Sequence, residues 1–143
     1  MLLLNEHGYT RKEGRCMRYS RQKEMVLSEV LSRCDHPTAD EIYTSVRVKC
    51  PGISLGTVYR NLNSLVEMGS IRRVGIPGKA DRFDRTLEPH NHMYCTCCGC
   101  VQDVSVDEEA LLAVLKKTPE LEMESYSLTL YGLCPSCRKK AQS

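Results

Sequence analysis

The first helix is predicted from the spacing of apolar side chains near the start of the chain. Leu27, Val30, Leu31 and Cys34 lie at positions i, i+3, i+4 and i+7, so they share one face of an α-helix. Ser20 precedes this stripe and can accept a hydrogen bond from a free backbone N–H, as helix N-caps do. We therefore expect a helix from Ser20 to about Cys34.

Two more helices are predicted by signals for helix starts and stops. The sequence Thr38-Ala-Asp-Glu41 has the form of a capping box, and Pro51 ends the helix that it opens. Ser54 can cap a third helix, which should end at Gly69, where a glycine after a helix terminus is favoured. The expected core-facing residues of the two helices are Ile42, Tyr43 and Val46, then Val58, Leu62, Leu65 and Val66.

The hydrophobic period changes from helical to alternating after the third helix. Ile71 and Val74, the turn-prone segment 75–78 and the segment 82–84 together predict a β-hairpin. Three helices followed by a hairpin are the order of a winged helix-turn-helix, in which the third helix enters the major groove of DNA and the hairpin contacts the backbone. The same pattern also fits a small α+β domain whose third helix packs against a partner protein.

A second, smaller α/β domain is expected after a hinge at residues 85–89. Leu111, Leu112 and Leu115 are expected to face inward from one helix of this domain. A domain this short buries little apolar surface, so a metal, a partner subunit or both should stabilise it. The fold class is therefore α+β, with domains at 1–84 and 90–143; the second domain has strands at 92–95, 101–106 and 124–131 and a helix at 107–118.

Composition places the chain among folded, water-soluble proteins. It has 143 residues, of which 41% are hydrophobic and 27% charged, and its formal net charge is +2. The charge is unevenly distributed, since residues 11–33 are mainly basic and residues 103–124 mainly acidic. No apolar run approaches the roughly 20 residues that cross a bilayer, and no signal peptide is visible. We expect a cytoplasmic protein without membrane contact.

Nine cysteines in such a chain favour metal binding or redox chemistry over a secreted disulfide framework. Two Cys-x-x-Cys pairs, Cys95/Cys98 and Cys134/Cys137, can supply the four thiolates of a tetrahedral structural zinc site. A dithiol redox switch is the alternative for the same pairs.

The register of the first pair is ambiguous, because Cys97 and Cys100 also form a Cys-x-x-Cys. We favour Cys95 and Cys98 because Gly99 directly follows the second cysteine and relieves the turn that directs backbone N–H groups at the sulfurs. Cys97 and Cys100 then become spare thiols.

Histidines and aspartates form a second candidate metal site. His90 and His92 project from one side of an extended chain, Asp84 ends the hairpin, and Asp103 follows the first cysteine pair. His36, in the turn before the second helix, could complete the set. Nitrogen and oxygen ligands suit Fe²⁺ or Mn²⁺ better than a thiophilic ion. A metal hydrolase could use such a site to activate water, but the sequence offers no substrate pocket or further general base, so we do not expect an enzyme.

The motifs, in their order along the chain, resemble the ferric uptake regulator family. The resemblance covers nearly the whole chain. It implies a dimeric, metal-dependent bacterial transcription regulator with a winged-helix domain and a C-terminal dimerisation domain. The matching motifs are Thr57-Val-Tyr-Arg60 with Leu62, Leu65 and Gly69; His90-x-His92-x-x-Cys95-x-x-Cys98-Gly99; and Leu130-Tyr-Gly-x-Cys134-x-x-Cys137.

The resemblance also implies which residues bind metals. Aspartate at position 103 is similar to the peroxide-responsive repressors of the family, whereas iron-responsive members usually have glutamate there. A further metal site of many iron regulators is not supported, because Pro89, Asn91 and Tyr126 replace its ligands. The implied structural zinc ligands are Cys95, Cys98, Cys134 and Cys137, and the implied regulatory ligands for Fe²⁺ or Mn²⁺ are His36, Asp84, His90, His92 and Asp103.

The implied activity is repression of transcription by a homodimer that binds operator DNA when the regulatory metal is bound. In the resembling peroxide sensors, bound Fe²⁺ reacts with hydrogen peroxide and a ligand histidine gains oxygen, which releases metal and DNA; here His36 and His90 would be oxidised. The alternatives are an iron-, manganese- or zinc-responsive regulator of the same family and a zinc-stabilised interaction module without DNA binding. The residues expected at the DNA are Thr57, Tyr59 and Arg60 on the third helix, with Arg18 and Arg21 at the backbone.

Overall fold

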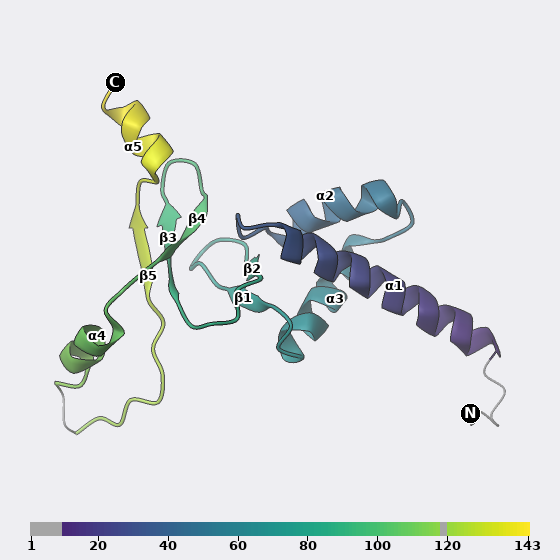
Figure 1. Cartoon of the computed structure of the whole chain (residues 1–143), viewed down its shortest axis with the longest axis horizontal. Helices are drawn as coiled ribbons and strands as arrows, with labels where there is room; N and C mark the ends of the chain where they lie inside the picture. Colours follow the sequence, from purple (N-terminus) through teal and green to yellow (C-terminus); the bar gives the residue numbers. More distant parts are fainter. Residues whose placement is uncertain (1–9, 118–119) are drawn as a thin grey trace. The chain divides into compact units, whose positions relative to one another are not determined.

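The computed structural model describes residues 10–117 and 120–143, with side chains from residue 21 onward (Figure 1). The side chain of Arg18 lies outside this description. The chain forms two compact units that divide between Leu87 and Glu88. Within the described residues, no helix is both long and apolar enough to cross a membrane. The elements are α1 (Thr10–Ser32), α2 (Ala39–Lys49), α3 (Leu55–Glu67), β1 (Arg72–Val74), β2 (Arg82–Asp84), β3 (Asn91–Cys95), β4 (Val101–Val104), α4 (Glu108–Leu115), β5 (Thr129–Gly132) and α5 (Pro135–Ala141).

The first helix is longer than predicted. It starts at Thr10, so the prediction that Ser20 caps it is wrong. The segment before Ser20 contains mostly Arg, Lys, Glu and Met, which are good helix formers, and no proline interrupts it. A serine inside a continuous helix has no free backbone N–H to cap.

The predicted caps of the next two helices are confirmed. Thr38 accepts a hydrogen bond from the backbone N–H of Glu41, and the Glu41 carboxylate accepts one from the Thr38 N–H at 2.8 Å. Ser54 accepts from the Thr57 N–H at 3.1 Å and so caps α3. At the other end of α3, Gly69 has a φ of +71°, a left-handed conformation that glycine adopts without strain.

The hydrophobic core of the first unit lies among α1, α2, α3 and the hairpin (Figure 1). Each large apolar side chain buried there contributes roughly 1.5–3 kcal/mol relative to exposure. The predicted core-facing positions of α2 and α3 are confirmed, because they are buried or pack against buried residues. The buried set includes Val26, Val30, Ile42, Val46, Val58, Leu62, Leu65, Ile71 and Phe83.

The predicted hairpin is confirmed and is attached to the turn between α1 and α2. β1 and β2 are antiparallel, with Arg73 opposite Phe83. The Phe83 N–H donates to the Pro37 carbonyl at 2.9 Å, and Thr38 forms an isolated bridge with Arg82. The hairpin therefore forms one unit with the helices, as the wing of a winged helix does.

The second unit is built on a sheet with the strand order β4-β3-β5. β4 and α4 are shorter than predicted, since β4 ends at Val104 and α4 at Leu115. The predicted strand at 124–131 is shorter and spans Thr129–Gly132. In the segment before it, the Tyr126 hydroxyl donates to Glu108 of α4 at 2.9 Å. The leucines of α4 are not buried within the described residues, and Leu115 is 43% exposed. No other described element of this unit covers the apolar face of α4, so the prediction that its leucines face inward is wrong for Leu115, whereas Leu111 and Leu112 are half-buried.

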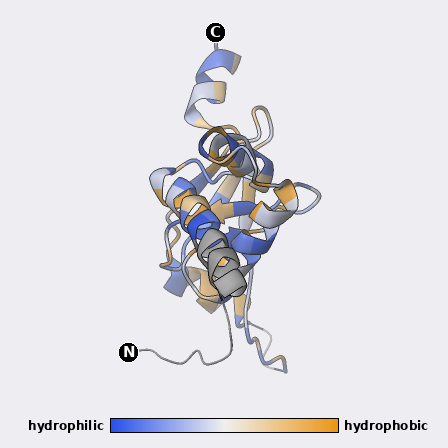
Figure 2. Ribbon diagram, turned by 90° about the vertical axis from the view of Figure 1, so that its right-hand side faces the viewer, coloured by the Kyte–Doolittle hydropathy of each residue, from blue (hydrophilic) through white to orange (hydrophobic). Residues whose placement is uncertain are grey.

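The described part of the second unit has a very small core. Its buried hydrophobic residues are Cys95, Val101, Cys134 and Cys137. The C-terminal helix α5 ends in basic residues and is largely hydrophilic in Figure 2, so it adds little apolar burial. Cysteine side chains thus take the place that aliphatic side chains hold in the first unit.

Core packing of the first unit can be tested on α3. We expect Leu62→Ala to lower the free energy of unfolding of this unit by about 2–5 kcal/mol, because its fully buried side chain leaves a cavity. Val48→Ala is the control, since Val48 is 79% exposed, and it should change stability by less than about 0.5 kcal/mol. Urea unfolding followed by circular dichroism measures both. Equal stability of the two variants would contradict this core.

Candidate metal centres and nucleic-acid interface

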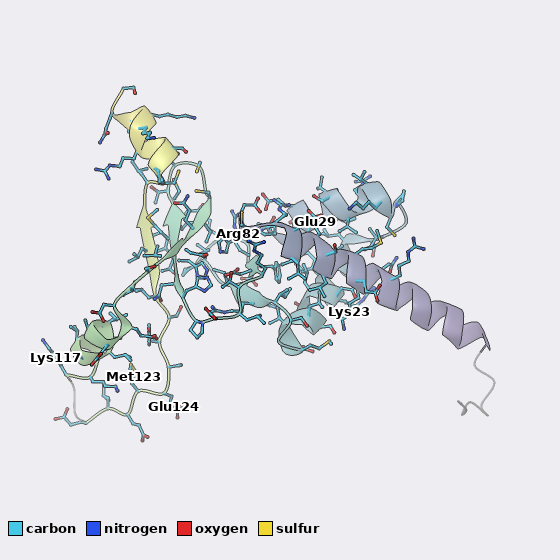
Figure 3. The ribbon with its side chains drawn as sticks, viewed as in Figure 1. Lys23, Glu29, Arg82, Lys117, Met123 and Glu124 are labelled. Atoms are coloured by element: carbon cyan, nitrogen blue, oxygen red, sulfur yellow. The ribbon has the colours of Figure 1, made fainter. Side chains whose placement is uncertain are left out.

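Cysteines gather at one end of the second unit's sheet, where the loop from β3 to β4 meets the start of α5. The sulfurs of Cys95, Cys98, Cys100 and Cys134 all lie within 4.8 Å of one another. Cys137 is buried in the same cluster, whereas Cys97 is exposed. Sulfur atoms are visible in yellow in this region of Figure 3. Three of the four cysteines predicted as zinc ligands, Cys95, Cys98 and Cys134, therefore belong to the mutually close group. Cys100, predicted as a spare thiol, completes this group, and Cys137 packs in the same buried cluster.

The cysteine cluster has dimensions that suit zinc. The sulfurs of Cys98 and Cys134 are 3.8 Å apart. A tetrahedral zinc with Zn–S bonds of about 2.3 Å separates its sulfurs by about 3.8 Å. The Cys134 N–H donates to the Cys95 sulfur at 3.3 Å, which is the kind of outer hydrogen bond that orients a thiolate ligand. Zinc would supply a cross-link between the β3–β4 loop and α5.

The thiols of the cluster have strongly different proton affinities. Backbone N–H groups, first that of Cys98 and then that of Cys134, lower the pKa of Cys95 to about 6. Burial, followed by the neighbouring Cys98 thiol, raises the pKa of Cys100 to about 12. Hydrogen bonding with Cys134 and other thiols raises the pKa of Cys137. Cys95 is thus prepared as a thiolate, whereas Cys100 and Cys137 hold their protons until a cation takes their place.

Two histidines and an aspartate of the second unit converge at the other end of β3. The register places His92 of β3 directly opposite Asp103 of β4. The Asp103 carboxylate oxygen lies 3.0 Å from His90 Nε2 and 3.5 Å from His92 Nε2. Two nitrogens and an oxygen therefore point to one place, as predicted for half of the regulatory site.

Backbone contacts fix which nitrogen of His90 can bind a metal. His90 Nδ1 lies 2.7 Å from the Glu88 carbonyl oxygen, and a carbonyl can only accept a hydrogen bond. Nδ1 therefore carries the proton in the neutral ring, and Nε2 presents its lone pair on the side of Asp103. This is the tautomer that a metal ligand needs.

The first unit holds the other two predicted regulatory ligands. His36 Nε2 lies 3.4 Å from an Asp84 carboxylate oxygen, and both side chains are 4% exposed. The Thr86 N–H donates to the other oxygen of Asp84 at 2.8 Å. His36 has a φ of 53°, which is uncommon for a residue other than glycine. The Arg82 guanidinium donates to its carbonyl at 3.2 Å and supports this conformation.

The predicted DNA-contacting residues lie at the exposed start of α3. Tyr59 is 42% exposed, so it is not a core residue. Arg60 is exposed and donates to the Thr57 hydroxyl at 3.0 Å. Arg21 is exposed on α1. These side chains are available to a ligand that approaches α3.

Sequence reasoning missed Arg73 of β1, which connects the hairpin with α3. Its guanidinium donates to Asn63 of α3 at 2.6 Å and lies 3.3 Å from Asp81. Lys23 forms a similar connection from α1, where Figure 3 labels it, and donates to the Ser64 hydroxyl at 2.7 Å. The basic pair Arg72-Arg73 in the predicted hairpin was the available signal for the wing contact.

The two units together define a class of protein. A winged helix-turn-helix is joined to a small sheet domain with a cysteine cluster and a histidine–aspartate group, which is the architecture of a metal-binding DNA-binding regulator. A model of the ferric uptake regulator family matches residues 14–131. The chain belongs to the ferric uptake regulator family.

Individual relatives include regulators of both peroxide and iron responses. The peroxide-responsive repressor of Staphylococcus epidermidis is 30% identical over 133 residues, which are 91% of this chain and 86% of that protein. The crystal structure of the Campylobacter jejuni peroxide stress regulator has 30% identity and a TM-score of 0.68, covering 92% of this chain and 99% of that one. The crystal structure of the Vibrio cholerae ferric uptake regulator has 32% identity and a TM-score of 0.63, covering 79% of this chain and 88% of that one.

Zinc analysis tests the cysteine cluster. We expect one tightly held zinc per chain and its loss in Cys134→Ser, because Cys134 is buried at the centre of the cluster. Elemental analysis after dialysis against a chelator measures the metal. Cys97→Ser is the matched control and should keep the zinc, since Cys97 is not one of the four mutually close sulfurs. A Cys134→Ser protein with full zinc content would contradict the assignment.

Proposed function

We propose that this protein is a metal-dependent repressor that senses hydrogen peroxide through oxidation of His36 or His90. The supporting observation is the position of Asp103, whose carboxylate lies within 3.5 Å of two imidazole nitrogens. This nitrogen and oxygen donor set suits Fe²⁺ or Mn²⁺ and not a thiophilic ion. The similarity to named peroxide regulators supports the same function.

The proposed regulatory ligands come from both sides of the proposed hinge at residues 85–89. His36 and Asp84 precede the hinge, and His90, His92 and Asp103 follow it. When all five residues bind one ion, Asp84 and His90 are held close to each other, and the hinge between them can no longer change its angle. Two recognition helices of a dimer must match half-sites separated by whole turns of DNA, so a fixed hinge angle favours operator binding.

Oxidation would reverse this coupling. Bound Fe²⁺ supplies one-electron chemistry toward hydrogen peroxide beside its ligands, which Mn²⁺ does not readily supply. A histidine that gains an oxygen atom no longer offers the same nitrogen lone pair. His90 is well placed for this role, because its Nε2 faces Asp103 while its Nδ1 is held by the Glu88 carbonyl. The remaining ligands then hold the ion too weakly to fix the hinge.

We further propose that the second unit forms the homodimer. Its exposed large apolar side chains lie on or near α4 and β5, which no described element of the unit covers. Burial of such a surface in a partner copy would add the apolar burial that the small core lacks. The exposed residues concerned are Val114, Leu115, Leu121, Met123, Leu130, Tyr131 and Leu133.

Metal sensing without peroxide chemistry is the second candidate. The Vibrio cholerae ferric uptake regulator is as similar in sequence as the peroxide regulators are. An iron-, manganese- or zinc-responsive regulator would use the same ligands and the same hinge. It would differ only in the response of the Fe²⁺ form to peroxide.

Operator binding depends on α3 in this proposal. We expect Tyr59→Ala with Arg60→Ala to weaken binding by about 1–3 kcal/mol per lost base contact, chiefly on the specific sequence. The DNA is an operator selected from a random pool by the Mn²⁺-loaded protein, and gel shift measures the affinity. Arg138→Ala on α5 removes the same charge elsewhere and is the control. Unchanged binding by a folded double variant would remove α3 from the interface.

Arg21 should behave differently from the residues of α3. Because Arg21 is proposed to contact a phosphate, Arg21→Ala should weaken binding to all DNA sequences alike and reduce the salt slope of binding by about 1. Binding to operator and to random DNA at several salt concentrations measures this. A loss confined to the operator would contradict a backbone role.

Peroxide exposure separates the two candidate functions. We expect the Fe²⁺ form to lose operator affinity and to gain the mass of one oxygen atom on the peptide that contains His36 or His90, as measured by gel shift and mass spectrometry. The Mn²⁺ form should do neither. Asp103→Glu should keep metal-dependent DNA binding and reduce the oxidation, because its longer side chain changes how the carboxylate reaches the ion. If the Fe²⁺ form keeps both its mass and its operator, metal sensing alone replaces peroxide sensing.

A further inference from the structure

The cysteine cluster contains more thiols than a zinc ion can bind. The group in which every sulfur lies within 4.8 Å of the others consists of Cys95, Cys98, Cys100 and Cys134. Cys137 packs in the same buried cluster and is 8% exposed. A structural zinc binds four ligands. At least five thiols therefore compete for four positions.

Backbone contacts place Cys100 at the cluster. The Cys95 N–H donates to the Cys100 carbonyl at 2.9 Å, and the Gly99 N–H donates to the Cys95 carbonyl at 2.9 Å. These two bonds close the loop between β3 and β4. Gly99 adopts a φ of +75°, and an added Cβ would lie 3.3 Å from the Tyr94 hydroxyl, so the loop depends on glycine here. Cys100 is thus held near the other sulfurs by the loop itself.

Cys137 reaches the cluster from a different element. It lies in the first turn of α5, which begins at Pro135 directly after Cys134. Cys95 ends β3 and Cys98 and Cys100 lie in the loop after it, whereas Cys134 and Cys137 belong to the C-terminal segment. A zinc ion bound by Cys100 would hold α5 through Cys134 alone, and one bound by Cys137 would hold it through two ligands.

We propose that Cys100 and Cys137 are interchangeable fourth ligands of the structural zinc, with Cys95, Cys98 and Cys134 as constant ligands. This inference rests on the zinc site of the proposed function and deepens it. In the exchange, the Zn–S bond to Cys137 breaks as the bond to Cys100 forms. The Cys100 thiol gives up its proton and the Cys137 thiolate takes one, so no oxidant is needed and the charge of the site is unchanged.

The exchange gives the zinc site a reserve ligand and frees one thiol at a time. Loss of Cys137 to alkylation leaves four thiolates for the zinc, so the link between the β3–β4 loop and Cys134 survives. With Cys100 bound, the start of α5 is released from the metal. The spare thiol is therefore on the loop in one form and on α5 in the other.

Zinc content of cysteine variants tests the exchange in the full-length chain. We expect Cys137→Ser and Cys100→Ser each to keep one zinc per chain and the double variant Cys100→Ser/Cys137→Ser to lose it. The matched control is Cys97→Ser/Cys137→Ser, which removes the exposed thiol of the same loop and should keep the zinc. Elemental analysis after chelator dialysis gives the zinc content of all four variants and the wild type.

Alkylation of the zinc-loaded wild type provides a second measurement that needs no folded double variant. Iodoacetamide at alkaline pH should label Cys100 and Cys137 slowly, because the pKa values of both thiols are raised. Cys100→Ser should slow the labelling of Cys137 further, because Cys137 then stays bound. Loss of zinc from Cys137→Ser alone, retention by the Cys100/Cys137 double variant, or unchanged labelling of Cys137 in Cys100→Ser would overturn the exchange. If one of these results is obtained while the wild type contains zinc, the exchange fails but the structural zinc site stands. A wild type without zinc would instead contradict the zinc site itself.

Discussion

The cysteine cluster is the constraint on which the second unit depends. Apart from Val101, the buried hydrophobic residues described in this unit are the cysteines themselves. Structural zinc in small modules contributes on the order of 10–16 kcal/mol, far more than one buried valine. The cluster joins the β3–β4 loop to the segment that follows β5, and this fixes the strands on both sides of β3. The register of β3 then places His92 opposite Asp103. The proposed zinc thus positions half of the proposed regulatory site.

The other half of the proposed regulatory site belongs to the hairpin of the first unit and the turn beside it. Asp84 is the last residue of β2, and the His36 carbonyl accepts a hydrogen bond from Arg82 on the same strand. Arg73 on the paired strand β1 donates to Asn63 of the recognition helix. A short chain of contacts therefore runs from the two ligands through the wing to α3. Under the proposed function, an ion that captures His36 and Asp84 acts on the DNA-binding surface through the wing.

Local signals in the sequence predicted the first unit well and the second unit less well. The caps at Thr38 and Ser54 and the glycine after α3 depend on neighbouring residues, so the sequence alone was sufficient. The parallel pairing of β3 with β5 joins segments far apart in the chain, which no local pattern predicts. The leucines of α4 recur with a helical period, but no described element of this unit covers them. The proximity of Cys100 to the proposed zinc ligands depends on how the loop closes around Gly99.

The proposed function requires one regulatory ion that residues from both sides of the 85–89 hinge bind together. Titration of Mn²⁺ into the zinc-loaded protein, followed by electron paramagnetic resonance, measures whether both sides bind it. We expect His36→Ala and His92→Ala each to weaken Mn²⁺ binding at least about 10-fold, while Asn91→Ala, next to His92 on β3, binds like the wild type. Wild-type Mn²⁺ affinity in His36→Ala would overturn the shared site, because the ion would then belong to the second unit alone.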